Sequence, residues 1–232
     1  MTHFSPRFTR RRFLGNVSSG IVSAPVLAAF AEEHLRWIES GDYADDLERT
    51  PALEEGPYYP DKLPLDRDND LLVIGAGDQA LGEVTHLFGR ILDTSGKPMK
   101  GLTVEIWQTD LHGAYIHSKS INSYNRDKLF QGFGQFETGK DGSYKFRTIK
   151  PVPYLFRAPH VHYKIKKGDR ELLTTQCLVA GHEKLDRDIV LRTLKDPKLR
   201  ELVLAKYVPK KGSKTGELQA KFDIVLGATP EA

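Results

Sequence analysis

The chain has 232 residues, of which 39% are hydrophobic and 28% charged, a composition typical of a folded protein rather than a disordered one. Four of its 34 basic residues and none of its 31 acidic residues lie within residues 1–31, so the rest of the chain is nearly neutral and its bulk charge predicts no nucleic-acid partner. The single cysteine, Cys177, excludes an intramolecular disulfide and any zinc or iron–sulfur site built from several cysteines.

The first 31 residues have the pattern of a targeting segment. Residues 9–15 contain three consecutive arginines, and a mildly apolar stretch follows over residues 17–31. That stretch is shorter than the roughly 20 apolar residues that cross a bilayer, so it predicts no stable membrane anchor. Small residues up to Ala31 fit a cleavage site. We therefore expect a twin-arginine type signal peptide in a bacterial protein that is exported to the periplasm or secreted; an ordinary secretory signal or a basic tail are the alternatives.

Residues 32–82 are expected to form an N-terminal helix and an extended arm. Residues 32–40 predict a short helix. Residues 51–70 are rich in proline and acidic side chains, a composition that favours an extended segment over regular structure. The expected domain order is thus a signal peptide, then this helix and arm, then a folded core over residues 83–232.

From residue 83 onward, short apolar or alternating runs are separated by turn residues. The expected strands cover residues 84–92, 102–108, 144–149, 160–166, 172–179 and 222–226, and a brief helix covers residues 197–207. Many short strands with turn signals between them are typical of an antiparallel sandwich or barrel. We predict a mainly β fold, an antiparallel β-sandwich with Greek-key connections of the immunoglobulin or prealbumin kind, with an N-terminal arm and short helices.

The strongest chemical signal is the pair His160 and His162 in one expected strand. Side chains alternate along a strand, so both imidazoles face one way and Val161 faces the other. Such a pair can bind one metal ion, although it is also common as a partly exposed cross-strand pair. Tyr154 lies shortly before it, and a phenol, with a pKa of about 10, becomes a ligand only for a strongly Lewis-acidic ion. Ferric iron meets that requirement better than zinc or magnesium does.

Five motifs extend this signal over much of the chain: Val104–Gln108, Gly113–Tyr115, Gly142–Pro151, Pro153–Tyr154 and His160–His162. In this order they resemble the motifs of the intradiol ring-cleavage dioxygenases, the non-haem ferric enzymes that include catechol and protocatechuate dioxygenases. The resemblance runs from about Thr50 to Ala180. The stretch from Tyr154 to His160 is shorter than in the protocatechuate enzymes, and we do not expect the long helical dimerisation region found at the front of the catechol and hydroxyquinol enzymes. The chain is more similar to a smaller, exported branch of the family.

The resemblance implies a site with four ligands to Fe(III). Tyr115 and His160 take the places of the equatorial ligands, and Tyr154 and His162 take those of the axial pair. From the residues alone, Tyr115 could instead be a packed core aromatic. His117, two residues further on, would share its face in an extended chain and is a competing ligand.

The resemblance also implies catalytic roles for Tyr154, Arg157 and Gln176. Tyr154 would leave the metal and accept a substrate proton as a general base. Arg157, permanently charged, would stabilise the negative charge that develops on the substrate ring. Gln176 matches a glutamine behind the ligands, although it could simply satisfy backbone groups between strands. Pro57 and Tyr58, together with Arg157, match residues that wall the substrate pocket.

The function implied is the cleavage of a catechol-type aromatic diol between its two hydroxylated carbons with O2, giving a muconate-type dicarboxylate. The partners that the resemblance implies are the small diol and O2 and, because the family commonly associates, a second copy of the chain in a homodimer. Two alternatives stay open. One is a metal-free, transthyretin-like sandwich that acts as a binding module, since sandwiches host many functions. The other is a metal-bound homologue with different substrate chemistry.

Overall fold

The computed structural model describes residues 46–73 and 79–227, which belong to one compact unit, Tyr43–Ala232. The expected signal peptide and the expected helix at residues 32–40 lie outside the described residues, so both stay predictions, as do the expected domain boundaries. Within the described ranges, no helix is long and apolar enough to cross a membrane.

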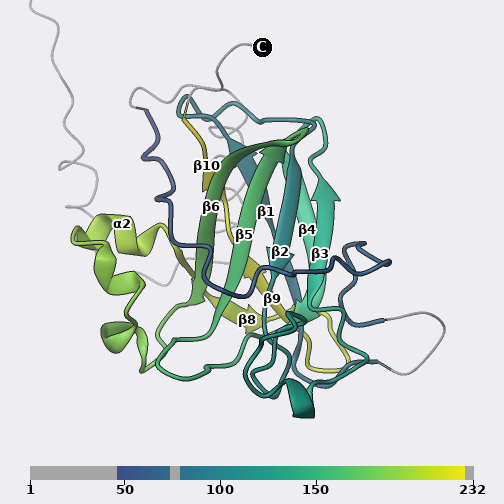
Figure 1. Ribbon diagram of the computed structural model, residues 1–232. Coiled ribbons are helices and arrows are strands. Elements are labelled where there is room, and N and C mark those ends of the chain that lie inside the picture. Colours follow the sequence, from purple (N-terminus) through teal and green to yellow (C-terminus); the bar gives the residue numbers. More distant parts are fainter. Residues whose placement is uncertain (1–45, 74–78, 228–232) are drawn as a thin grey trace, which may run out of the picture. The chain divides into compact units, whose positions relative to one another are not determined.

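One five-stranded sheet is built around its longest strand, β1 (Val84–Leu92) (Figure 1). Its other strands are β4 (Ser143–Ile149), β8 (Tyr207–Pro209), β9 (Leu218–Lys221) and β10 (Ile224–Val225). Strand β1 pairs antiparallel with β4 but parallel with β9 and β10, and β8 pairs antiparallel with β9.

The second sheet carries the candidate site, in the strand order β3-β2-β5-β6-β7. Its strands are β2 (Thr103–Trp107), β3 (Phe133–Glu137), β5 (His160–Lys167), β6 (Arg170–Val179) and β7 (Leu204–Ala205). All neighbours pair antiparallel except β6 and β7, which are parallel. The helices described are short: η2 (Ser123–Asn125), η3 (Leu185–Arg187), η4 (Leu191–Thr193) and α2 (Pro197–Glu201).

The mainly β prediction is confirmed, but the prediction of purely antiparallel sheets is wrong because both sheets are mixed. Strands β7, β9 and β10 reach their partners through long connections rather than tight hairpins, and such connections permit parallel pairing. The Greek-key order stays a prediction. The helix expected over residues 197–207 is also too long, because α2 ends at Glu201 and β7 begins at Leu204.

The two sheets share one apolar core. Tyr163 of β5 packs against Tyr144 of β4, with ring centroids 5.9 Å apart, and against Phe222 at 5.1 Å. Val161 and Cys177 point into the same core and are fully buried, so Cys177 is a packing residue, as expected from its alternation with Gln176. Along β5 and β6, the side chains next to Val161 and Cys177 therefore lie on the opposite face of the sheet that contains β2, β5 and β6.

That opposite face is covered by residues 50–60, which we call the arm segment. Backbone N–H of Leu53 donates to the carbonyl of Thr174 at 3.0 Å, and the Tyr59 hydroxyl donates to Glu105 at 3.0 Å. The Glu55 carboxylate pairs with the ammonium group of Lys164, which lies 4.1 Å above the centre of the Tyr59 ring. These contacts enclose the face that presents His160 and His162.

Candidate metal centre

The two histidines lie where strand alternation predicts them. His160 and His162 are both buried, and their Nε2 atoms lie 3.2 Å apart. The Nδ1 atom of His160 lies 2.6 Å from the carbonyl oxygen of Ala158. Because a carbonyl only accepts, this Nδ1 carries the proton and Nε2 offers its lone pair. The orientation is the one a metal-binding histidine requires.

Tyr115 is brought to this pair by a tightly bonded loop after β2. The Asp110 carboxylate accepts the N–H of Ala114 at 2.9 Å, and the hydroxyl of Ser120 accepts the N–H of Tyr115 at 2.8 Å. The Tyr115 hydroxyl consequently lies 3.3 Å from His160 Nε2 and 3.0 Å from His162 Nε2. Three potential ligand atoms therefore converge from two separate segments of the chain.

A second tyrosine, Tyr154, borders the same cluster from the loop before β5. It is half-buried, and its ring centroid lies 5.4 Å from that of Tyr115 and 5.6 Å from that of His160. Tyr58 of the arm segment stacks on Tyr115, with centroids 5.2 Å apart. Pro57 beside it is exposed.

His117, the competing ligand, has different neighbours. It packs edge-on against Tyr58 at 5.8 Å, and its Nδ1 accepts the N–H of Lys119 at 3.0 Å. The structure thus brings the hydroxyl of Tyr115, and not the ring of His117, to the imidazole pair.

The sequence alone indicated no role for Trp107, which the structure places in the site. It is the cross-strand partner of His162 on β2, it is fully buried, and the two rings stack with centroids 4.7 Å apart and an interplanar angle of 8°. The expected strands over residues 102–108 and 160–166 contain both residues, and residues that pair across neighbouring strands pack against each other. The register between β2 and β5 was needed to find the pair.

Burial keeps these groups neutral. It lowers the pKa of His160 to about 3, helped by the charge of Arg157, and lowers the pKa of His162 well below its usual value. It also raises the pKa of Tyr115 far above its usual value and, less strongly, that of Tyr154. The imidazoles are therefore ready to bind a cation, whereas the phenols lose their protons only to a cation that strongly favours phenolate.

The spacing and the chemistry of these residues fit a ferric ion. Ligand atoms about 2.1 Å from a metal and at right angles to each other are about 3 Å apart, which is the spacing of the three converging atoms. The described residues contain no group of three or more histidine, cysteine, aspartate or glutamate side chains that could hold a metal. A metal held by these residues would have phenolate oxygen among its ligands, a donor that suits Fe(III) better than zinc or magnesium.

Arg157 and Gln176 lie next to this cluster. Arg157 is buried, donates from Nε to the Asp188 carboxylate at 2.9 Å and donates from Nη2 to the side-chain oxygen of Gln176. Burial raises the pKa of Tyr154 and the nearby charge of Arg157 partly opposes this effect, while the backbone N–H of Arg157 donates to the carbonyl of Tyr154 at 2.9 Å. Gln176 is the cross-strand partner of His162 and donates to the carbonyl of Glu54 at 2.8 Å, so it links the arm segment to Arg157.

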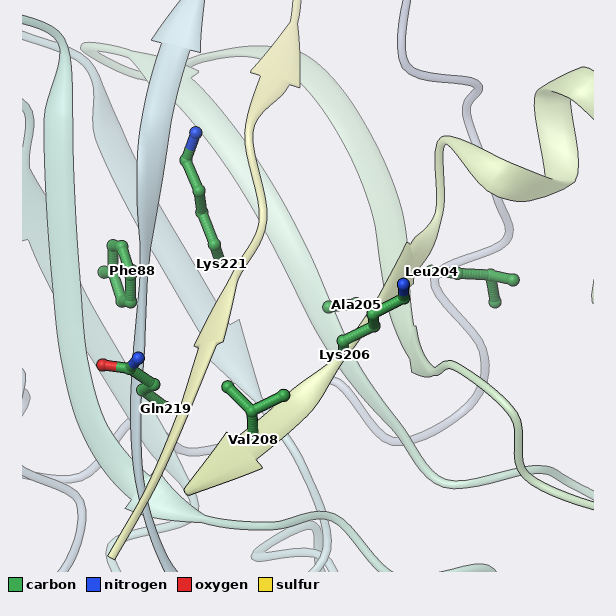
Figure 2. Close-up of a pocket in the computed structure, with 7 residues that line it drawn as sticks. All are labelled: Phe88, Leu204, Ala205, Lys206, Val208, Gln219 and Lys221. Atoms are coloured by element: carbon green, nitrogen blue, oxygen red, sulfur yellow. The ribbon is translucent and has the colours of Figure 1, made fainter. Parts of the chain in front are cut away.

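A surface groove of about 490 Å³ lies elsewhere (Figure 2). It is lined by Phe88, Leu204, Ala205, Lys206, Val208, Gln219 and Lys221, which come from β1, β7, β8, β9 and the residue between β7 and β8. None of these is a histidine, a tyrosine or a carboxylate, so the groove offers no competing metal centre.

Comparisons with known proteins find similarity to dioxygenases. The profile of a family described as "Dioxygenase" covers residues 54–228. The protocatechuate 3,4-dioxygenase beta chain of Burkholderia cepacia is 31% identical over 214 residues, which is 82% of this chain and 90% of that protein. The 6-chlorohydroxyquinol 1,2-dioxygenase of Cupriavidus pinatubonensis is 29% identical over 65% of this chain, but the match spans only 56% of that protein.

A solved structure shares the fold. The dioxygenase domain of a dioxygenase–carbohydrate-binding protein fusion from Streptomyces sp. SirexAA-E is 27% identical, with a TM-score of 0.60, and the match covers 78% of this chain and all of that one. An intradiol ring-cleavage dioxygenase from Tetranychus urticae, 19% identical with a TM-score of 0.61, shows the same fold, with 80% of this chain and 97% of that one covered.

Proposed function

This chain belongs to the intradiol ring-cleavage dioxygenase family, whose members are oxidoreductases, and from that premise we propose that it uses Fe(III) and O2 to cleave a catechol-type diol between its hydroxylated carbons. Both oxygen atoms would enter the product, a muconate-type dicarboxylate. The observation that carries the proposal is the convergence of the Tyr115 hydroxyl with the Nε2 atoms of His160 and His162.

The residues that would hold the iron are Tyr115, Tyr154, His160 and His162. When bound, ferric iron supplies the Lewis acidity that stabilises phenolate and catecholate oxygen near neutral pH. His160 is oriented for this by the carbonyl of Ala158, and His162 by its stack on Trp107.

The remaining steps belong to side chains around the ligands. We assign to Tyr154, in the phenolate form that bound iron would stabilise, the acceptance of one catechol proton, because its side chain is only half-buried and lies beside the other ligands. Arg157 would stabilise negative charge on the substrate ring from its place beside Tyr154. Tyr58, stacked on Tyr115, would form one wall of the substrate pocket and Pro57 its outer edge.

The colour of the purified protein tests the proposal directly. Phenolate bound to ferric iron absorbs broadly in the visible range, so the iron-loaded protein should be wine-red and should consume one O2 per catechol cleaved. The substrate panel is catechol, protocatechuate, hydroxyquinol and chlorinated catechols, with iron measured on the same sample. A colourless protein without iron would favour the metal-free binding module, and a red protein without turnover would favour a homologue with different chemistry.

Replacing Tyr154 by phenylalanine tests whether Tyr154 acts as a metal ligand and general base or only as a packing residue. We expect Tyr154→Phe to shift the visible band, because one phenolate is lost, and to lower kcat about hundredfold, the usual scale for removing a general base. Iron should stay bound through the three remaining ligands. Tyr124→Phe is the matched control, since Tyr124 is 90% exposed. An unchanged band in Tyr154→Phe would rule out Tyr154 as a ligand.

We also propose export by a twin-arginine signal, on the basis of the three arginines within residues 9–15 and the apolar stretch that follows them. Replacing Arg10, Arg11 and Arg12 by lysine should leave the precursor in the cytoplasm of a bacterial host. Arg7→Lys is the matched control and should be exported. Export of the triple variant at the normal rate would contradict the proposal.

A homodimer is the assembly we propose for the exported protein. Leu155 and Phe156 at the turn after Tyr154 are 59% and 77% exposed, and exposed apolar side chains of this size favour association. Light scattering on the eluted protein should give twice the mass of one chain, and a mass of one chain would contradict this.

A further inference from the structure

We infer that Asp188 is the positioning residue that holds Arg157 over the reaction site. This inference rests on the proposed ring-cleavage activity and adds a residue to it. Asp188 lies between η3 and η4, outside every motif that carries the family resemblance, and its side chain is fully buried. A buried carboxylate requires partners that compensate for its lost hydration.

The partners of Asp188 are four N–H donors, two for each carboxylate oxygen. Oδ1 accepts the backbone N–H groups of Val190 at 3.0 Å and of Leu191 at 2.9 Å. Oδ2 accepts Nε of Arg157 at 2.9 Å and the backbone N–H of Ala158 at 2.7 Å. Asp188 therefore joins the segment at 190–191 to the backbone and the side chain of the segment at 157–158.

This arrangement determines where the guanidinium group lies. Asp188 holds Arg157 at Nε and Gln176 holds it at Nη2, so two points of the rigid planar group are located and its rotation is prevented. Gln176 is itself oriented, because its amide nitrogen donates to the carbonyl of Glu54. The charge that the reaction needs is thus positioned before the substrate binds.

The same carboxylate also stabilises the backbone beside a metal ligand. Its Oδ2 holds the N–H of Ala158, and the carbonyl of Ala158 orients His160. Oδ2 of Asp188 therefore fixes the position of both the Arg157 guanidinium group and the Ala158 peptide, which faces the candidate metal centre. The short helices around it are packed on Leu53, Ala158 and Leu178 in a separate apolar cluster, which holds Asp188 in place from behind.

Asparagine at position 188 cannot reproduce these contacts. A carboxylate accepts all four hydrogen bonds, whereas an amide accepts on its oxygen only and presents two N–H groups of its own. If the amide nitrogen faces Arg157 and Ala158, two donors oppose it. If it faces Val190 and Leu191, two backbone N–H groups lose their acceptor. In either orientation, asparagine therefore fixes the Arg157 guanidinium group, or the backbone that supports it, less firmly than aspartate does.

The experiment is a double-variant cycle of Asp188→Asn and Arg157→Met, with kcat expressed per bound iron and KM measured for the best catechol. We expect Asp188→Asn to lower kcat about tenfold to hundredfold, the scale found for residues that orient a site from behind. KM should change less than kcat, and the visible band should be unchanged because all four proposed ligands remain. Asp186→Asn, an exposed aspartate two residues away, is the control and should match the wild type.

The double variant decides how Asp188 acts. If it acts through Arg157, adding Asp188→Asn to Arg157→Met should lower kcat no further than about twofold. A loss in the double variant equal to the product of the two single losses would overturn the inference, as would a wild-type kcat per iron in Asp188→Asn. A wild type that turns over no catechol would instead contradict the proposed function.

Thermal unfolding keeps the inference testable if Asp188→Asn does not fold well or if no substrate is found. Arg157→Met leaves a buried carboxylate without its cation, so it should melt well below the wild type. Asp188→Asn loses acceptors for backbone N–H groups in either background, but after Arg157→Met it also removes an unpaired buried charge, so it should lower the melting temperature less there than in the wild type. An equal or larger decrease in the Arg157→Met background would show that the two side chains are not coupled, and would overturn the inference without any activity measurement.

Discussion

Replacing His162 by alanine is expected to abolish iron binding and ring cleavage together. His162 Nε2 lies 3.0 Å from the Tyr115 hydroxyl and 3.2 Å from His160 Nε2, so its loss leaves only two of the three converging atoms, whereas loss of the Tyr154 hydroxyl leaves all three. The remaining phenols have raised pKa values and bind a cation only if it displaces their protons. Iron per chain should fall from one to near zero, the red colour should disappear, and O2 uptake should drop to background.

His86→Ala is the control for this result. His86 lies on β1 in the other sheet, where it pairs with Glu217 at 3.0 Å and is partly exposed. Its removal should leave the iron content, colour and turnover unchanged. Full iron content with a wild-type visible band in His162→Ala would contradict the assignment of His162 as a ligand.

Replacing Trp107 by alanine is expected to give the largest loss of stability. Trp107 is fully buried between Tyr59, whose ring centroid is 5.0 Å away, and His162, at 4.7 Å. Removing a buried indole costs about 3–5 kcal/mol, because the lost transfer energy is added to the cost of the cavity that remains. Urea unfolding of the iron-free protein should show a decrease in the free energy of unfolding of this size.

The same substitution should weaken iron binding, because His162 loses the ring on which it stacks. Trp107→Phe should retain part of both properties. Phe88→Ala is the matched control: Phe88 lies on β1 at the surface groove, is 37% exposed, and should cost about 1 kcal/mol or less (Figure 2). A loss in Trp107→Ala no larger than in Phe88→Ala would contradict its role as a packing support of the site.

Strands with regular alternation could be predicted from the sequence, and those without it could not. The strand expected over residues 84–92 matches β1 residue for residue. Strand β3 was not expected, and it contains Gly134, where a Cβ atom would lie 2.7 Å from Leu71 and 2.8 Å from the carbonyl of Asp68. A glycine inside a strand usually signals a break or a close approach of another segment, and only the folded chain shows that it is a close approach.

The residues of the site likewise divide into those that the sequence indicated and those that it did not. The alternation in His160-Val161-His162 was sufficient to predict two imidazoles on one face and an apolar side chain opposite, because that property is local to one strand. The family motifs further indicated Tyr115, Tyr154, Arg157 and Gln176. Nothing near residue 188 indicated a role for Asp188, since its partner Arg157 is 31 residues away and no short-range pattern links them.

The residue pattern by itself determined the family, the mainly β character of the core and the metal-binding chemistry expected of it, because these depend on side-chain types and on spacing along one strand or turn. Only the tertiary structure decided the strand order, the parallel pairing of β7, β9 and β10, the stack of Trp107 on His162 and the bond between Asp188 and Arg157. Each of these joins segments that are distant in the chain, and such contacts form according to which buried groups fit together in space rather than according to the sequence between them.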